Sequence, residues 1–247
     1  MSAQPSASSA VDLSIVMPAY NEEARIRPTL TEYLEQFFPA FKGRFEVIVV
    51  LNGSVDGTRG VVEEVAQSWP QVRIIEFPRP LGKGGAVWEG MAIARGSLLA
   101  FVDADNMVRA PETEKLVRAL DTHDVAIGDR FSGRRSDDAQ PPLRRFVSIA
   151  SRTWVRMFLG LPFSDTQCGA KAFRAPVWRA VAPKVAERGW AFDLDVLAHV
   201  QLLGLSVAEV PVQWKHVPEG SKVQAWRDVP STFLATFRIR CRARKDG

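Results

Sequence analysis

Short apolar runs alternate with longer amphipathic stretches along the first half of the chain. The apolar runs predict strands at residues 13–17, 47–51, 72–76, 98–102 and 125–128. The stretches between them predict helices at residues 22–38, 56–68 and 82–95. Strands that alternate with helices indicate right-handed β–α–β crossovers, and therefore an α/β fold with a mainly parallel central sheet flanked by helices.

The pattern changes after Asp129. Residues 132–142 are rich in Ser, Asp, Arg and Pro and predict a mobile loop. Beyond it, the pattern predicts helices at residues 144–159 and 191–203 and strands at residues 167–173 and 206–210. The chain contains neither an internal repeat nor a clear linker, so we expect the two halves to share one core.

Composition divides the chain into three parts. Residues 1–11 are rich in Ser and Ala and lack a charged start and a long apolar core, which predicts a disordered lead-in rather than a signal peptide. Residues 12–228 form the predicted domain, with halves at 12–129 and 130–228. Residues 229–247 form a basic C-terminal segment.

Two features bear on the location of the protein. Cys168 and Cys241 lie far apart in the sequence, which gives no disulfide framework and favours a reducing compartment. No apolar segment approaches the ~20 residues that a membrane-spanning helix needs. We therefore expect a cytoplasmic protein.

The chain is modestly basic, with 32 Lys and Arg residues against 28 Asp and Glu residues. The excess arginines gather in residues 130–156 and at the C-terminus. Such clusters indicate an anionic partner: nucleic acid, anionic lipid or a phosphate-bearing substrate. No helix-turn-helix, zinc-finger or RNA-binding signature accompanies them, so we expect no nucleic acid and favour a phosphate or a membrane surface.

Asp103-Ala104-Asp105 directly follows the apolar run at residues 98–102. Its two carboxylates would emerge at the carboxyl end of a buried strand, where open α/β sheets bind their ligands. Oxygen ligands of this kind suit Mg²⁺ or Mn²⁺ held against a diphosphate. A solvated acidic turn is the competing interpretation of the triplet taken alone.

Two further segments suit a nucleotide. The turn after the first predicted strand, residues 18–23, can present backbone groups and the Tyr20 ring to a base, although an ordinary proline turn with an Asn cap has the same pattern. Lys83 precedes Gly84 and Gly85 at a predicted helix start, where a lysine and free backbone N–H groups suit a diphosphate. A glycine-rich helix entry with an exposed lysine is the alternative.

Four motifs occur in order: Val16–Glu22, Asn52–Thr58, Gly82–Ala86 and Asp103–Asp105. This ordered set resembles the family 2 inverting glycosyltransferases with the GT-A fold. Later segments are similar to the polyprenyl-phosphate and dolichyl-phosphate glucosyltransferase branch, which is related to the dolichyl-phosphate mannose synthases; these segments are Asp165–Lys171, Gly189–Asp193 and Gly220–Lys222. The resemblance covers residues 12–228.

The resemblance implies a Rossmann-like sheet with a smaller C-terminal portion on the acceptor side, and a nucleotide-sugar donor. It implies that the donor contacts Pro18, Tyr20, Glu22, Asn52, Lys83, Asp103 and Lys222. Asp105 would be the principal ligand of Mg²⁺ or Mn²⁺, together with Asp103; His216 is either a further ligand or a surface histidine. One departure stands out, because the family usually has Asp-Asp-Gly-Ser where this chain has Leu51-Asn52-Gly53-Ser54. An Asn amide can donate as well as accept hydrogen bonds, whereas an Asp carboxylate only accepts them. The choice between UDP and GDP therefore stays open.

A phosphate acceptor is largely ionised near neutral pH, so its transfer reaction needs positioning more than a strong base. The resemblance implies an acceptor-phosphate cradle of Arg130, Arg145 and Ser148, with Arg152 one helical turn further on. A solvated basic helix face is the alternative. We expect Asp193, and after it Asp165, to orient or deprotonate the acceptor, although Asp193 at a helix start is also a candidate N-cap.

The C-terminal segment combines apolar and basic residues. Trp226, Phe233, Leu234 and Phe237 would line one side of a helix that begins near Pro230, which predicts peripheral contact with an anionic bilayer. Residues 237–244 also alternate with period two, a strand pattern, and a frayed soluble tail is a further alternative.

Taken together, these patterns lead us to expect an enzyme that transfers a hexose, glucose from UDP-glucose first of all, to a polyprenyl or dolichyl phosphate with inversion. The alternatives are the same chemistry on a soluble acceptor and a non-catalytic nucleotide-sugar-binding protein.

Overall fold

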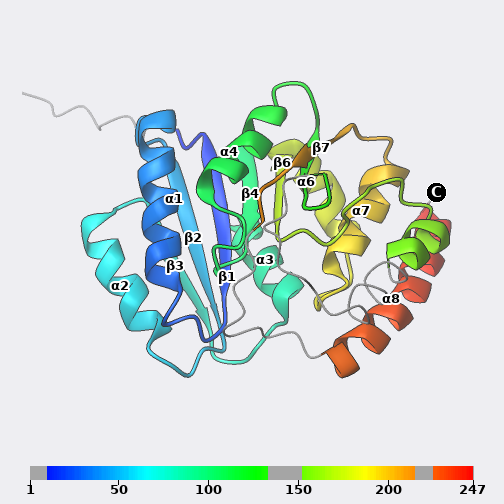
Figure 1. Ribbon diagram of the computed structural model, residues 1–247, viewed down its shortest axis with the longest axis horizontal. Coiled ribbons are helices and arrows are strands. Elements are labelled where there is room, and N and C mark those ends of the chain that lie inside the picture. Colours follow the sequence, from blue (N-terminus) through cyan, green and yellow to red (C-terminus); the bar gives the residue numbers. More distant parts are fainter. Residues whose placement is uncertain (1–9, 133–151, 215–224, 247) are drawn as a thin grey trace, which may run out of the picture.

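The computed structural model describes residues 10–132, 152–214 and 225–246 of the chain. At its centre, helices cover both faces of a seven-stranded sheet with the strand order β3-β2-β1-β4-β6-β5-β7 (Figure 1). The strands are β1 (Leu13–Ala19), β2 (Phe45–Asn52), β3 (Val72–Phe77), β4 (Leu98–Val102), β5 (Val125–Asp129), β6 (Ala170–Arg174) and β7 (Val207–Pro211). Strand β6 runs antiparallel to β4 and β5, and the other neighbouring pairs are parallel. The predicted α/β fold with a mainly parallel sheet is confirmed.

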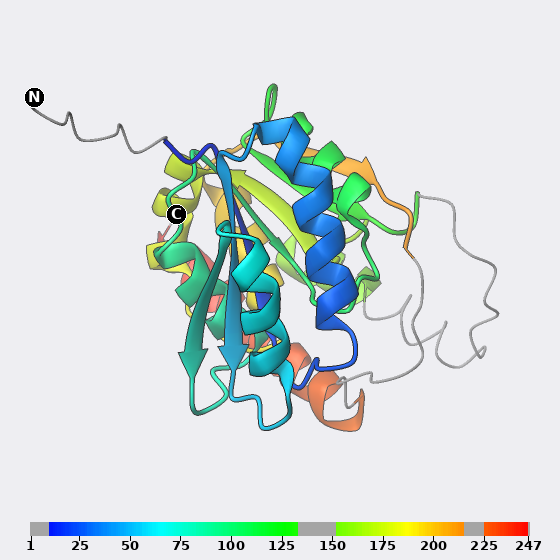
Figure 2. The same cartoon turned by 90° about the vertical axis from the view of Figure 1, so that its left-hand side faces the viewer.

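Two helical layers enclose the sheet (Figure 2). One layer contains α1 (Ile26–Phe41), α2 (Thr58–Ser68) and α4 (Ala110–Ala119). The other contains α3 (Lys83–Ala92), residues 152–159, α6 (Ala175–Val181), α7 (Phe192–Leu202) and α8 (Ala225–Asp246), with a short 3₁₀ turn, η1 (Ala182–Lys184), after α6. Strands buried on both faces explain why β1, β2 and β4 are apolar almost throughout.

Strand β1 illustrates how the sequence determines this arrangement. Ile15 and Met17 belong to the core cluster under α1, whereas Val16 points to the opposite face and packs in the cluster under α3. Because successive strand side chains point to opposite faces, a continuous apolar run fills both cores at once.

Several helix boundaries differ from the predicted ones. Helix α1 begins at Ile26 rather than at residue 22, because Glu22 and its neighbours form a turn whose backbone pairs with the start of α2: the Glu22 N–H donates to Thr58 Oγ1 at 2.8 Å. Helices α4 and α6 were not predicted at all, although each has a Pro in its first turn, a position that Pro favours.

The C-terminal segment is a helix, so the strand interpretation of residues 237–244 was wrong. Ala235 and Ile239, four residues apart, are buried in the same cluster as α7. Arg238 and Arg242, also four residues apart, both reach Glu187. The segment therefore contains pairs of residues at the i, i+4 spacing of a helix, in addition to the period-two alternation of its arginines. In the parts of the chain that the structure describes, no helix combines the length and the hydropathy needed to cross a membrane.

The topology gathers several chain ends at one edge of the sheet. The carboxyl ends of β1, β2, β4 and β5 lie at this edge because these strands point the same way. Strand β6 runs the opposite way, so the residues just before it, 165–169, lie beside the end of β4. This is the edge at which the acidic triplet was predicted.

Candidate functional site

Asp103 and Lys83 form an ion pair at the carboxyl end of β4. Lys83 Nζ lies 2.8 Å from Asp103 Oδ1 and 3.0 Å from Oδ2. Burial by itself would lower the pKa of Lys83, but the charges of Asp103, Asp193 and Asp105 together raise this pKa above its ordinary value. Lys83 therefore stays protonated and brings a fixed positive charge to the acidic triplet.

Asp105 lies close enough to Asp103 for the charges of the two carboxylates to interact. Burial, and after it the charge of Asp103, raises the pKa of the Asp105 carboxyl above its ordinary range. Its Oδ1 accepts a hydrogen bond from the Met107 N–H at 3.1 Å. Two mutually repelling oxygen ligands of this kind fit Mg²⁺ or Mn²⁺.

The described residues contain no group of three or more His, Cys, Asp or Glu side chains that would enclose a metal ion. Asp103 and Asp105 would therefore supply two carboxylates, and substrate phosphates and water would complete the shell, as is usual for Mg²⁺. The suggested ligand His216 lies outside the described residues.

The first turn of α3 packs closely against residues 186–192, which we call the bridge segment. A Cβ on Gly82, whose φ is +80°, would lie 2.6 Å from the Arg188 carbonyl oxygen, and a Cβ on Gly84 would lie 2.2 Å from Phe192 Cβ. The Gly85 N–H donates to the Arg188 carbonyl at 2.8 Å. These contacts explain why glycines surround Lys83. They also occupy a helix amide that was expected to be free, and the contact of Lys83 with a diphosphate stays a prediction.

The residues expected around the nucleoside divide into two groups. Tyr20 is 41% exposed at the edge of the sheet, and Pro18 before it is half-buried. Asn52 is buried: its amide donates to the Gly82 carbonyl at 3.2 Å and accepts from the Leu81 N–H at 2.7 Å. The N–H₂ group and the oxygen of the Asn52 amide thus both bind the loop that leads to Lys83. The contacts of these residues with a base stay a prediction.

Glu22 is also held by protein groups. Its carboxylate accepts two hydrogen bonds from Arg25, at 2.7 and 2.8 Å. Asn21 adopts a φ of +53° and accepts from the Val55 N–H at 2.8 Å. Asn21 is therefore not a helix cap; together with Glu22 it ties the β1 loop to the β2 loop.

Asp193 lies in the first turn of α7 and is buried with Lys171 of β6. Lys171 Nζ lies 2.6 Å from Asp193 Oδ1 and donates to the Cys168 carbonyl at 2.8 Å. The N-cap position belongs to Ala191, so Asp193 is not the cap that the sequence left open. Lys171 was not assigned a role from the sequence. The available signal was a charged residue inside an otherwise apolar strand.

Arg130 and Asp165, which were expected in different roles, are partners. Arg130 Nε donates to Asp165 Oδ2 at 2.6 Å and Arg130 Nη2 donates to Asp165 Oδ1 at 2.8 Å. Asp165 is buried and Arg130 is half-buried. Each side chain is the counter-ion of the other, so Arg130 is only partly available to an incoming phosphate.

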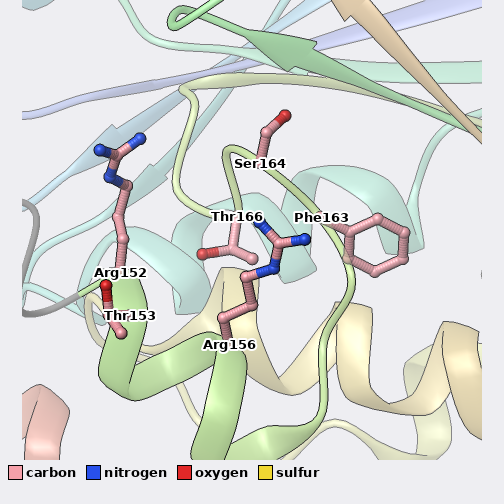
Figure 3. A pocket seen from close by; sticks show the side chains of 6 residues that line it. All are labelled: Arg152, Thr153, Arg156, Phe163, Ser164 and Thr166. Carbon is pink, nitrogen blue, oxygen red and sulfur yellow. The ribbon is translucent and has the colours of Figure 1, made fainter.

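A basic pocket lies between the helix at residues 152–159 and residues 163–166 (Figure 3). Its lining comprises two arginines, three hydroxyl side chains and one ring: Arg152, Arg156, Thr153, Ser164, Thr166 and Phe163. Thr166 follows Asp165 directly, which connects the pocket to Arg130.

The two arginines of this pocket lie four residues apart on the helix at residues 152–159. The Arg152 guanidinium carbon lies 3.7 Å from the centre of the Phe131 ring. Across the described residues, Arg156 makes no hydrogen bond or ion pair with protein groups. Arg152 was predicted; Arg156 was missed, although its i, i+4 spacing was the available signal. Arg145, Ser148 and Lys222 lie outside the described residues.

The charges at the edge nearly balance. The carboxylates of Asp103, Asp105 and Asp193 face the ammonium groups of Lys83 and Lys171, which leaves one negative charge. A divalent cation would change the sign of this balance and make the edge attractive to a diphosphate.

Comparisons with known proteins identify the family of the chain. The profile of glycosyl transferase family 2 matches residues 14–186. A dolichyl-phosphate beta-glucosyltransferase of Trichomonas vaginalis is 35% identical over 222 residues, which are 85% of this chain and 65% of that protein. The human dolichyl-phosphate beta-glucosyltransferase is also 35% identical, over 85% of this chain and 69% of its own length. Glycosyltransferase AglD of Haloferax volcanii is 36% identical over 92% of this chain, which spans only 37% of that protein.

Solved structures share the fold. Glucosyl-3-phosphoglycerate synthase from Mycobacterium tuberculosis, in a complex with Mn²⁺, UDP and glucosyl-3-phosphoglycerate, superposes with a TM-score of 0.65 at 22% identity, over 93% of this chain and 80% of that chain. The same enzyme in a complex with UDP gives a TM-score of 0.66 over 94% of this chain and 80% of that one, at 21% identity. The predicted GT-A fold is therefore confirmed, and the chain belongs to glycosyl transferase family 2.

Proposed function

We propose that this chain is a metal-dependent inverting hexosyltransferase that moves glucose from UDP-glucose to a polyprenyl or dolichyl phosphate. Its family, and the names of relatives at 30–36% identity such as those of yeast and human, support a glucosyl transfer of this kind. Complexes of the structural neighbours with UDP and Mn²⁺ or Mg²⁺ support the donor and the cation.

The donor would bind at the carboxyl end of β4. Asp103 and Asp105 would hold Mg²⁺ or Mn²⁺, which supplies positive charge to the leaving diphosphate when it is bound. Lys83 would add a second positive charge from α3, and Lys222 is proposed to approach from the C-terminal side. Tyr20 and Pro18 would contact the nucleoside, while Asn52 and Glu22 would hold the surrounding loops.

One observation favours a phosphate acceptor over an alcohol. Both candidate bases already serve as counter-ions: Asp193 pairs with buried Lys171, and both oxygens of Asp165 accept hydrogen bonds from Arg130. A hydroxyl acceptor needs a base to remove its proton, whereas an ionised phosphate oxygen carries its charge on arrival. We therefore propose that Asp193 and Asp165 orient the site rather than take a proton.

Arg156 and Arg152 would receive the acceptor phosphate, together with the neighbouring hydroxyl groups of Thr153 and Thr166. Guanidinium groups bind phosphate through paired hydrogen bonds, which fixes its direction as well as neutralising it. Arg145 and Ser148 belong to the same proposal through the family resemblance.

The test compares acceptors that differ only in the phosphate. We expect glucose transfer from UDP-glucose to a polyprenyl phosphate in the presence of Mn²⁺, with inversion at the anomeric carbon, and no transfer to the matching polyprenol or to water-soluble alcohols. Transfer to the alcohols instead would favour the soluble-acceptor alternative. Donor binding without transfer to any acceptor would favour the non-catalytic one.

We also propose that α8 contacts the surface of a membrane, on its cytoplasmic face. Met157, Phe233, Leu234 and Phe237 keep 79%, 43%, 59% and 42% of their surface exposed. They belong to two helices that pack together, because the Phe233 and Phe237 rings lie 4.7 and 6.1 Å from the ring of Trp154, on the helix that carries Met157. The side chain of Trp226 lies outside the described residues.

Arginines contribute less to this surface than the sequence suggested. Arg238 and Arg242 pair with Glu187, and Arg240 donates to the Phe158 carbonyl at 2.8 Å. We therefore expect binding that depends on the exposed apolar residues more than on anionic lipid. In a flotation assay, Leu234→Ser and Phe237→Ser should move the protein off polyprenyl-phosphate-containing liposomes; a wild-type protein that stays in the soluble fraction would contradict the proposal.

A further inference from the structure

The bridge segment, residues 186–192, packs against the first turn of α3, which carries Lys83. Its Arg188 carbonyl accepts the Gly85 N–H of α3, and the ring of Phe192 fills the space above Gly84. Lys83 Nζ lies 5.7 Å from the centre of the Trp190 ring, which belongs to the bridge segment. The position of the Lys83 ammonium therefore depends on where the bridge segment lies.

The other side of the bridge segment is fastened by Asp195. This carboxylate is completely buried in α7, and its Oδ2 accepts the N–H groups of Ala186 and Glu187 at 2.8 and 2.9 Å. The same oxygen accepts a hydrogen bond from Arg242 Nη2 of α8 at 3.0 Å. Arg242 Nη2 also lies 3.0 Å from Glu187 Oε1. One guanidinium thus joins the C-terminal helix to Glu187 of the bridge segment and to Asp195 of α7.

The surroundings of Asp195 also favour the ionised form of its carboxyl. Burial alone would raise the pKa of its carboxyl, but hydrogen bonds from His199 and the Glu187 and Ala186 amides, with the charge of Arg242, hold this pKa below its ordinary value. A buried carboxylate that loses a cationic partner must find another or move toward water. Removal of Arg242 would therefore disturb the amides that Asp195 holds.

We infer that Asp195 and Arg242 are positioning residues, which act through the bridge segment to hold Lys83 at the donor diphosphate. Neither residue is placed as a substrate contact: the Asp195 side chain is completely buried, and the Arg242 guanidinium is paired with Asp195 and Glu187. The inference rests on the proposed function, in which Lys83 faces the diphosphate. It assigns to α8 a role in donor binding that is separate from any contact with lipid.

The experiment measures UDP binding in the presence of Mn²⁺ by calorimetry, for the full chain and three variants. Arg242→Gln should weaken UDP binding about tenfold, the size of coupling expected between residues of one network. Arg242→Lys should give an intermediate affinity. Arg244→Gln, the same change at an exposed position two residues on, should leave the affinity unchanged. In turnover assays, Arg242→Gln should raise KM for the donor and leave KM for the acceptor unchanged.

A second measurement separates the inference from the proposed function. Hydrogen exchange at the Gly85 amide should accelerate in Arg242→Gln and not in Arg244→Gln, whether or not UDP is the donor. Unchanged Gly85 exchange and unchanged UDP affinity in a folded Arg242→Gln protein would overturn the inference. If that variant does not fold, Arg242→Lys takes its place, with the same two measurements and a smaller expected change. A wild-type protein that fails to bind UDP, with Gly85 exchange still coupled to Arg242, would contradict the proposed function alone.

Discussion

Lys171 and Asp193 form a buried ion pair of 2.6 Å beneath the candidate site, with the lysine side chain fully enclosed and its ammonium 5.5 Å from the centre of the Phe101 ring. Removal of one partner leaves the other charge without compensation in the core. Lys171→Met should therefore lower the free energy of unfolding by about 3–5 kcal/mol. Urea denaturation followed by circular dichroism measures this loss.

A surface pair provides the matched control. Arg44 lies 2.7 Å from Asp12, and both side chains are partly exposed, so Arg44→Met should cost less than about 1 kcal/mol. Adding Asp193→Asn to Lys171→Met should restore part of the lost stability, because the uncompensated charge is removed. A double variant whose loss equals the sum of the two single losses would show that the pair is not coupled.

Arg156 is expected to act on the acceptor alone. Arg156→Ala should raise KM for polyprenyl phosphate about tenfold, since a hydrogen bond to a charged group is worth about 1.5 kcal/mol, while the affinity for UDP stays the same. Arg179→Ala, at an exposed arginine in the last turn of α6, serves as the control. If the two substitutions change KM for polyprenyl phosphate equally, the pocket is not part of the acceptor site.

The sequence was sufficient wherever local pattern determines structure. The apolar run of β4 and the acidic triplet after it predicted both the strand and the edge at which Asp103 and Asp105 lie. The family motifs brought Lys83 to the same place. These predictions needed only a strand, its end and the direction of its neighbours.

Pairings between distant residues could not be predicted in the same way. Arg130 and Asp165 are 35 residues apart, and Lys171 and Asp193 are 22 residues apart. Their partnerships follow from the antiparallel insertion of β6 between β4 and β5, which no local pattern reveals. The role of Glu187 in binding two arginines of α8 was hidden for the same reason.

Two glycines should respond to the same substitution with opposite signs. Gly84→Ala places a Cβ 2.2 Å from Phe192 Cβ and should destabilise the protein by about 1–3 kcal/mol, because the core must shift. Gly60 lies within α2 with open space around its Cα, so Gly60→Ala should stabilise by about 0.5–1 kcal/mol. Urea midpoints of the two variants test both signs. A neutral Gly84→Ala would contradict the close packing of α3 on the bridge segment.

Glu46 should make stability depend on pH in the acid range. Burial alone would raise the pKa of this carboxyl, but hydrogen bonds from Ser14, Arg73 and the Arg95 amide outweigh burial and lower the pKa below its ordinary value of 4.5. The unfolded chain therefore binds a proton at higher pH than the folded protein does. The stability contributed by Glu46 is complete above pH 4.5 and is lost as the pH falls through the folded pKa.

Glu46→Gln should accordingly flatten the acid side of the stability profile. Urea midpoints measured from about pH 6 down to about pH 3 should fall less steeply for this variant than for the wild type. Glu63→Gln, at an exposed position of α2, should leave the slope unchanged. Parallel profiles for wild type and Glu46→Gln would exclude Glu46 as the source of the pH dependence.

The central claim is that the two carboxylates after β4 hold a divalent cation against the donor diphosphate. Anomalous diffraction from crystals soaked with Mn²⁺ and UDP tests it most directly. The account predicts one manganese peak about 2 Å from a carboxylate oxygen of Asp105, with the UDP phosphates on its other side. A manganese ion and a nucleotide bound elsewhere, away from Asp103 and Asp105, would contradict it.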